Sequence, residues 1–215
     1  MLKKLVAELI GTFILVFAIT GAVTINQQTG GAIGHVGVAI TVGLALMMII
    51  FSIGNISGAH VNPAVSISMA IAKKLAWKDL APYIIMQVAG AFIATLVLRS
   101  LFPNDVSLGT TVPSGTDMQS FIMETILTFL LVTSILASTA NPNNSIMIPA
   151  IAIGGTLGLD AMFGGPVSGA SMNPALSLAP SVITNNMSHL WVYIAGPLVG
   201  GILAVIIRGV IAPKE

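Results

Sequence analysis

Residues 57–66 read Ser-Gly-Ala-His-Val-Asn-Pro-Ala-Val-Ser, and residues 168–177 read Ser-Gly-Ala-Ser-Met-Asn-Pro-Ala-Leu-Ser. The stretches share the frame Ser-Gly-Ala-x-x-Asn-Pro-Ala-x-Ser, and Asn62 of the first corresponds to Asn173 of the second, an offset of 111 residues. Asparagine is a preferred helix N-cap, and a proline after it already has the φ angle of a first helical residue. Each Asn-Pro is therefore predicted to start a helix, entered from a Ser-Gly-Ala segment that favours extended chain.

The apolar run after each Asn-Pro-Ala is only about ten residues long, which is too short to span a bilayer. A half-helix entered from non-helical chain is tolerated at membrane depth only where it lines a cavity or is buried in protein. Two such segments at corresponding places in two halves of a chain indicate a permeation site. We therefore expect the midplane of a pore at two motifs, which are Asn62, Pro63, Ala64 and Asn173, Pro174, Ala175.

The composition is that of a polytopic membrane protein. Of 215 residues, 55% are hydrophobic and only 7% are charged, and we predict a single membrane domain covering residues 1–215. A formal net charge of +1 argues against a nucleic-acid partner. The chain has no cysteine and no clustered His, Asp or Glu, so neither a disulfide nor a metal site is expected. With no nucleophile–base pair either, we expect no enzyme activity and no cofactor.

Six longer apolar segments are predicted to cross the membrane, at about 5–25, 36–54, 80–102, 119–139, 146–164 and 190–211. One half-helix follows the second span and the other follows the fifth, so the same pattern occurs twice, at about 1–102 and 119–211. Residues 8–16 also resemble residues 124–132. An odd number of spans in each repeat gives the halves opposite orientations. The expected fold is all-α, with six transmembrane helices and two re-entrant half-helices in an inverted repeat.

The basic residues predict the orientation. With the N-terminus in the cytoplasm, seven of the eight lysines and arginines fall on the cytoplasmic side, and only Arg99 lies outside. We expect a multi-pass protein of the cell membrane with both termini cytoplasmic, and a first span that is retained rather than cleaved. The seven cytoplasmic residues are Lys3, Lys4, Lys73, Lys74, Lys78, Arg208 and Lys214.

At the paired Asn-Pro-Ala motifs the chain resembles the major intrinsic protein family, which comprises the aquaporins and aquaglyceroporins. The likeness covers essentially the whole chain, and residues 163–175 are similar to the nodulin-26-like branch and its prokaryotic relatives. That branch includes channels for glycerol, metalloid acids and other small neutral solutes. The resemblance implies a homotetramer with one pore in each protomer.

The resemblance also implies how the pore is built. The half-helices would enter from opposite faces and meet near the midplane, where Asn62 and Asn173 each direct an amide N–H at the pore. The carbonyls of residues 57–61 and 168–172 would form a ladder of acceptors. Two positive helix ends facing one point would oppose cations and protons there. An amide donor binds water or a hydroxyl without carrying charge.

The family's narrowest point is made by four side chains, and the resemblance places them at Val42, Ala161, Ala170 and Leu176. Water-selective members typically have an aromatic residue, a histidine, a small residue and an arginine there, and glycerol-conducting members keep the arginine. This sequence departs from both patterns, most clearly at Leu176, where arginine is usual. The ring is expected to be wider than a water filter, but it offers no donor, and apolar constrictions can gate by dewetting.

Four polar residues within the membrane are candidates for a role at the pore. Matching glutamates of the family brace the re-entrant loops by accepting backbone hydrogen bonds, and this role is expected for Glu8 and Glu124. Asp160 is next to Ala161 but about 100° away around a helix, so it either braces the outer loop or lines the outer vestibule. His60 would line the pore or brace its loop, or act as a pH-sensitive gate.

The favoured function is a passive channel for water and small uncharged solutes such as glycerol or metalloid acids. A secondary transporter is an alternative, because transporters also use inverted repeats and broken helices. It would need coupling groups, whereas the expected midplane groups are neutral amides. A non-conducting structural relative is a further alternative, which a blocked pore would support.

Overall fold

The computed structural model describes residues 1–141 and 143–211, and all regular secondary structure in these ranges is helical. Six of the helices are long and apolar enough to cross a membrane, and two are short. This confirms the predicted architecture of six spans and two half-helices. The helices are α1 (Leu2–Gln28), α2 (Gly34–Ser57), α3 (Pro63–Ile71), α4 (Trp77–Leu101), α5 (Asp117–Ser138), α6 (Met147–Ser168), α7 (Pro174–Ile183) and α8 (Leu190–Ile211).

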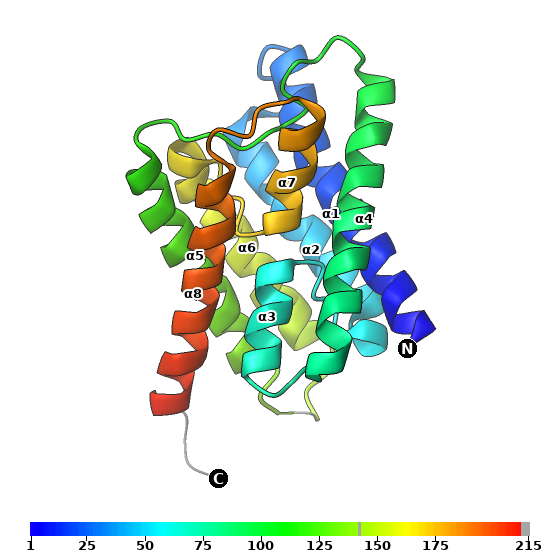
Figure 1. Cartoon of the computed structure of the whole chain (residues 1–215), viewed down its shortest axis with the longest axis vertical. Helices are drawn as coiled ribbons and strands as arrows, with labels where there is room; N and C mark the ends of the chain where they lie inside the picture. Colours follow the sequence, from blue (N-terminus) through cyan, green and yellow to red (C-terminus); the bar gives the residue numbers. More distant parts are fainter. Residues whose placement is uncertain (142, 212–215) are drawn as a thin grey trace.

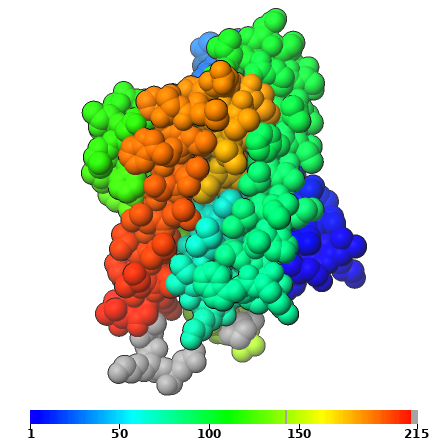
Figure 2. Space-filling view, viewed as in Figure 1, coloured from blue at the N-terminus to red at the C-terminus, as the bar shows by residue number. Residues whose placement is uncertain are grey.

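The two short helices lie one above the other in the middle of the molecule, between α8 on one side and α4 on the other (Figure 1). Both α3 and α7 contact α4 and α8, and they also contact each other. Figure 2 shows that, on this face, the side chains of the two half-helix segments fill the space between α8 and α4. The half-helices are therefore held by the long helices of both halves of the chain.

The long helices pack in two groups that meet at α2 and α6. In one group α1 packs against α2 and α4, and in the other α5 packs against α6 and α8. The main buried core lies between α1, α2, α5 and α6 and extends to the half-helices; it includes Leu46, Ile49, Leu131 and Leu157. Because α3 and α7 pack beside this core, most of the residues that precede them are buried, although Gly58 and Gly169 stay exposed.

Glycines allow the closest helix approaches. A Cβ on Gly43 of α2 would lie 2.8 Å from the carbonyl oxygen of Gly154 and 3.1 Å from Cα of Gly158, both in α6. At Gly90 of α4 a Cβ would overlap the carbonyl oxygen of Leu9 in α1. Since lipid gives helices no hydrophobic reason to associate, such backbone contact is a main source of their packing energy.

Basic residues gather at one end of the molecule. The start of α1, the turn between α3 and α4, and the end of α8 all lie at the lower end in Figure 1. Arg99, in the last turn of α4, lies at the opposite end. Lys214 falls outside the described residues. The segments at the lower end carry Lys3, Lys4, Lys73, Lys74, Lys78 and Arg208.

We predict that Gly90→Ala lowers the free energy of unfolding by about 1–3 kcal/mol, because the new methyl group overlaps backbone atoms of α1. Thermal unfolding in detergent, followed by tryptophan fluorescence, measures the effect. Gly209→Ala is the matched control, since a Cβ there, also within a long helix, meets no atom within 4 Å. Unfolding of Gly90→Ala at the wild-type temperature would contradict the packing described here.

Candidate functional site

The segments that lead into α3 and α7 have an unusual backbone conformation. Helices α2 and α6 each end at a left-handed glycine, with φ of 91° at Gly58 and 83° at Gly169. The expectation of extended chain was wrong, because two further residues in each segment are also left-handed. Such φ values cost of order 1–3 kcal/mol each in residues other than glycine, so the surrounding protein must hold them. These residues are Ala59 (φ 48°), Val61 (φ 45°), Ala170 (φ 47°) and Met172 (φ 53°).

Both asparagines cap their half-helices. The side-chain oxygen of Asn62 accepts a hydrogen bond from the backbone N–H of Ala64 at 2.8 Å, and that of Asn173 accepts one from Ala175 at 3.0 Å. The proline between each pair lies at the first helical position, where its missing N–H removes no bond. The local sequence is thus sufficient to explain where each half-helix begins.

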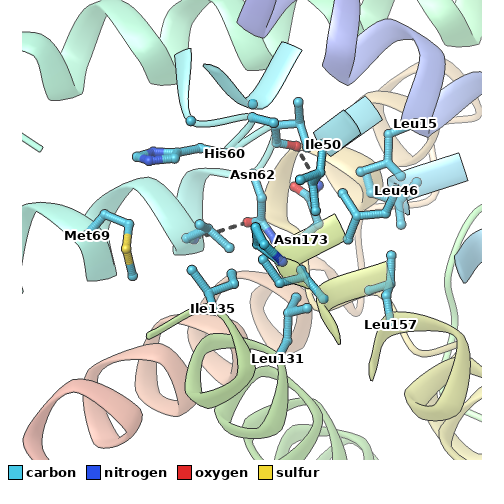
Figure 3. A pocket seen from close by; sticks show the side chains of 18 of the residues that line it. Leu15, Leu46, Ile50, His60, Asn62, Met69, Leu131, Ile135, Leu157 and Asn173 are labelled. Atoms are coloured by element: carbon cyan, nitrogen blue, oxygen red, sulfur yellow. Dashed lines mark hydrogen bonds between the residues drawn. The ribbon is translucent and has the colours of Figure 1, made fainter. Parts of the chain in front are cut away.

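The amide nitrogens of the two asparagines link the halves of the chain. Nδ2 of Asn62 donates to the carbonyl of Met172 at 2.7 Å, and Nδ2 of Asn173 donates to the carbonyl of Val61 at 2.9 Å. Figure 3 shows the two asparagine side chains close together at the centre of the site. A side-chain amide has two N–H donors, so each asparagine retains one that has no partner within the described residues.

Glu8 of α1 holds the first segment. It is fully buried and accepts hydrogen bonds from the backbone N–H groups of His60 at 3.0 Å and Val61 at 2.7 Å. Gln87 of α4 donates to the same carboxylate at 2.8 Å and to the hydroxyl of Ser66 at 2.8 Å. These are the contacts that a bracing role requires, and they satisfy backbone groups that cannot reach water.

Glu124 of α5 makes the matching contacts in the second half. It is fully buried and accepts hydrogen bonds from the backbone N–H groups of Ser171 at 2.9 Å and Met172 at 2.7 Å. The hydroxyl of Ser168 donates to it at 2.7 Å. Two carboxylates on different helices therefore hold two similar strained segments in the same way.

Two tyrosines complete the support. The hydroxyl of Tyr83 in α4 donates to the carbonyl of Ser57 at 2.9 Å, and that of Tyr193 in α8 donates to the carbonyl of Ser168 at 2.7 Å. Sequence analysis did not single out either tyrosine or Gln87. The repeat in the sequence could have identified the tyrosines, because their separation along the chain is nearly the same as that of the two asparagines.

The expected ladder of carbonyls is shorter than the resemblance implies. The carbonyls of Ser57, Val61, Ser168 and Met172 all accept hydrogen bonds from protein side chains. The carbonyls of residues 58–60 and 169–171 accept none from the part of the chain that the structure describes. Three carbonyls in each segment thus remain as acceptors.

A cavity of about 210 Å³ adjoins both segments. At one end it is lined by Lys74, Thr139 and Ile146, which we call the Lys74 mouth, and toward the other end by Val42 and Leu176. Asn62, Asn173 and His60 line it between these ends, and Figure 3 shows the two asparagines among apolar side chains. The apolar lining includes Leu15, Leu46, Ile50, Leu131, Ile135 and Leu157.

The structure brings together three of the four residues of the predicted ring at this cavity. Val42, Ala170 and Leu176 line it, and each is at least nine-tenths buried. Ala161 is buried in the same core but is not among the lining residues. All four side chains are apolar, so nothing in the ring offers a hydrogen bond to a solute.

Asp160 occupies neither of the positions expected for it. Its side chain is fully buried, so it lines no open vestibule, and neither carboxylate oxygen has a hydrogen-bond partner within residues 1–141 and 143–211. It therefore makes no loop-bracing bond. The residue at the corresponding position of the first half is Ile49, which is also buried. The fold thus needs no polar group at this position.

His60 lines the cavity, as expected for one of its possible roles. Its Nδ1 lies 3.1 Å from the hydroxyl of Ser66, and its ring packs edge-on against Tyr83 at a centroid distance of 5.4 Å. In the second half the corresponding pair is Ser171 and Ser177, whose hydroxyls are 2.6 Å apart. In each half, a polar contact between the segment before the half-helix and its first turn therefore supports the start of that helix.

Comparison with known proteins agrees with this geometry. Residues 1–208 match the family described as Major intrinsic protein. Aquaporin NIP1-3 of Oryza sativa subsp. japonica is 42% identical over 203 residues, which are 93% of this chain and 70% of that protein. Nodulin-26 of Glycine max is 39% identical, over 94% of this chain and 74% of its own length.

A solved structure has the same fold. The X-ray structure of the aquaglyceroporin from Plasmodium falciparum superposes with a TM-score of 0.89, covering 98% of this chain and 96% of that one, at 23% sequence identity. At this identity the likeness establishes the fold, whereas the family is established by the match along residues 1–208 and by relatives about 40% identical. The chain belongs to the major intrinsic protein family.

Proposed function

We propose that this protein is a passive channel for small uncharged solutes, with water among them, and that the cavity is its conduction path. The observation that carries the proposal is the pair of unused amide N–H groups on Asn62 and Asn173, which face a cavity lined otherwise by apolar side chains. A solute hydroxyl or a water molecule can accept from these donors and donate to nearby free carbonyls. No reaction is involved, and flux follows the concentration gradient.

The same geometry favours neutral solutes over ions. The N-terminal ends of α3 and α7 face each other, and each carries about half a positive charge. The ring beyond them is apolar and replaces none of an ion's hydration. Because Val42 and Ala170, which line the cavity at the ring, have small side chains, we infer that molecules of the size of glycerol or a metalloid acid pass the ring.

We further propose assembly as a homotetramer in the cell membrane, with both termini in the cytoplasm. The groove between α2 and α6 is lined on the outside by Gly43, Gly154, Gly155 and Gly158, and small residues of this kind favour helix contacts in membranes. A stripe of exposed apolar residues follows α2 at helical spacing. It consists of Val36, Ile40, Leu44, Met48 and Phe51, and it is suited to lipid or to a neighbouring protomer.

We predict that Leu176→Arg lowers glycerol flux about tenfold and water flux less than about threefold, because a long charged side chain narrows the ring but supplies donors that water can use. Stopped-flow light scattering of proteoliposomes with several osmolytes measures both rates. Leu176→Met is the control, since it keeps the size and apolar character of the side chain. Fast water flux without glycerol flux in the wild type would refute the position proposed for the constriction.

We predict that Asn62→Asp and Asn173→Asp let cations through, with currents in planar bilayers raised about tenfold or more by the new negative charge. The carboxylate opposes the positive helix ends and loses the donor that contacts the other half of the chain. Asn186→Asp makes the same chemical change at an exposed position and serves as the control. Currents at the wild-type level in both pore variants would exclude the asparagines from the conduction path.

We predict that Lys78 and Val106 lie on opposite sides of the membrane. Because the chain has no cysteine, Lys78→Cys and Val106→Cys each introduce a single thiol at an exposed position. In right-side-out vesicles an impermeant thiol reagent should modify the cysteine at position 106 and spare the one at position 78. Faster labelling at position 78 would reverse the proposed orientation.

A further inference from the structure

Lys74 is the only charged side chain among the described residues that line the cavity. It lies in the turn between α3 and α4, in the first half of the chain. Its Nζ is 3.1 Å from the hydroxyl and 3.4 Å from the carbonyl oxygen of Thr139, at the end of α5 in the second half. The side chain therefore reaches across the Lys74 mouth and places its ammonium group beside the entrance.

No carboxylate neutralises this ammonium group. The atoms that it contacts belong to a hydroxyl and a carbonyl, and no acidic group of the described residues lies within 4.0 Å of its nitrogen. Arg208 of α8 acts on Lys74, and Lys73 and Lys78 lie near it in the chain, as does one acidic residue, Asp79, in the first turn of α4. The positive charge of Lys74 is therefore offset by no carboxylate in contact with it.

At the far side of the conduction path, no lining residue within 1–141 and 143–211 is charged. Leu176 stands where the family usually has arginine, and the residues of the ring are all apolar. Apart from the partial charges of the half-helix ends, the described residues that line the path carry one fixed cationic charge, and it is at the opposite end from the ring.

We propose that Lys74 determines ion selectivity, by forming an electrostatic barrier that repels cations at the Lys74 mouth while neutral solutes pass beside it. This inference rests on the proposed function, since it assigns the barrier to the same conduction path. A fixed charge at the entrance of a path lined mostly by apolar side chains acts on ions and very little on neutral molecules. The flexible stem of lysine lets the ammonium group move aside for a solute without leaving the entrance.

Charge variants of Lys74 test the proposal in bilayers and in liposomes. We expect potassium conductance to rise about threefold in Lys74→Met and about tenfold in Lys74→Glu, with Lys74→Arg close to the wild type. Lys73→Met and Lys78→Met remove the same charge from the same turn but not from the lining, and we expect both to keep the wild-type conductance. Glycerol and water flux, measured for every variant in liposomes, should stay within about twofold of the wild type because these solutes are uncharged.

A pH series gives an independent readout. Burial and the positive charge of Arg208 lower the pKa of Lys74 below the usual range of lysine. The barrier is therefore present while Lys74 is protonated, below this lowered pKa, and it is lost as the pH rises through that pKa. Wild-type potassium conductance should increase at alkaline pH, whereas in Lys74→Arg it should not, because arginine stays protonated. The variants at positions 73 and 78 should follow the wild type.

The outcomes separate the two proposals. If the wild type carries no neutral solute, the proposed function fails. If neutral flux is intact but potassium conductance is the same in the wild type, Lys74→Met and Lys74→Glu, the barrier is not at Lys74 and this inference is overturned. An equal rise in conductance in Lys73→Met would also overturn it, because the effect would then belong to the general charge of the turn.

Discussion

Backbone polar groups at membrane depth must find partners within the protein, and this constraint organises the centre of the molecule. The segments before α3 and α7 are not helical, so their N–H groups cannot bond within a helix. Glu8 and Glu124 accept two of these N–H groups each, at 2.7–3.0 Å. Because the carboxylates belong to α1 and α5, each half-helix is positioned by a long helix of its own half. The strained left-handed residues persist because these bonds hold them.

The halves are then joined at the point where the solute would pass. Asn62 donates to the carbonyl of Met172, and Asn173 donates to that of Val61, so each asparagine caps its own helix and holds the other segment. Capping and cross-linking use one oxygen and one N–H of each amide. Within the part of the chain that the structure describes, each amide keeps one N–H donor without a partner, and this neutral group is suited to water and hydroxyls.

At some corresponding positions the two halves of the chain carry different kinds of residue. Ile49 and Asp160 occupy corresponding positions, yet only one is polar, and the carboxyl of Asp160 has no partner within the described residues. The turn after α3 carries Lys73 and Lys74, whereas the turn after α7 carries asparagines. Since the backbone is similar in both halves, these differences cannot be required by the fold. The second difference gives the two ends of the path different charges, because lysines lie at one end and neutral asparagines at the other.

The sequence by itself determined the parts that depend on local properties. Apolar length predicted the six spans to within a few residues at most ends, and Asn-Pro predicted both half-helix starts, because hydropathy and capping act over short stretches of chain. Only the tertiary structure decided the rest. It placed left-handed residues where extended chain was expected, left Asp160 unpartnered, kept Ala161 out of the cavity lining, and brought Lys74 to Thr139, 65 residues away. Each of these features depends on how helices that are far apart in the sequence pack together. A local pattern of residues does not predict such packing.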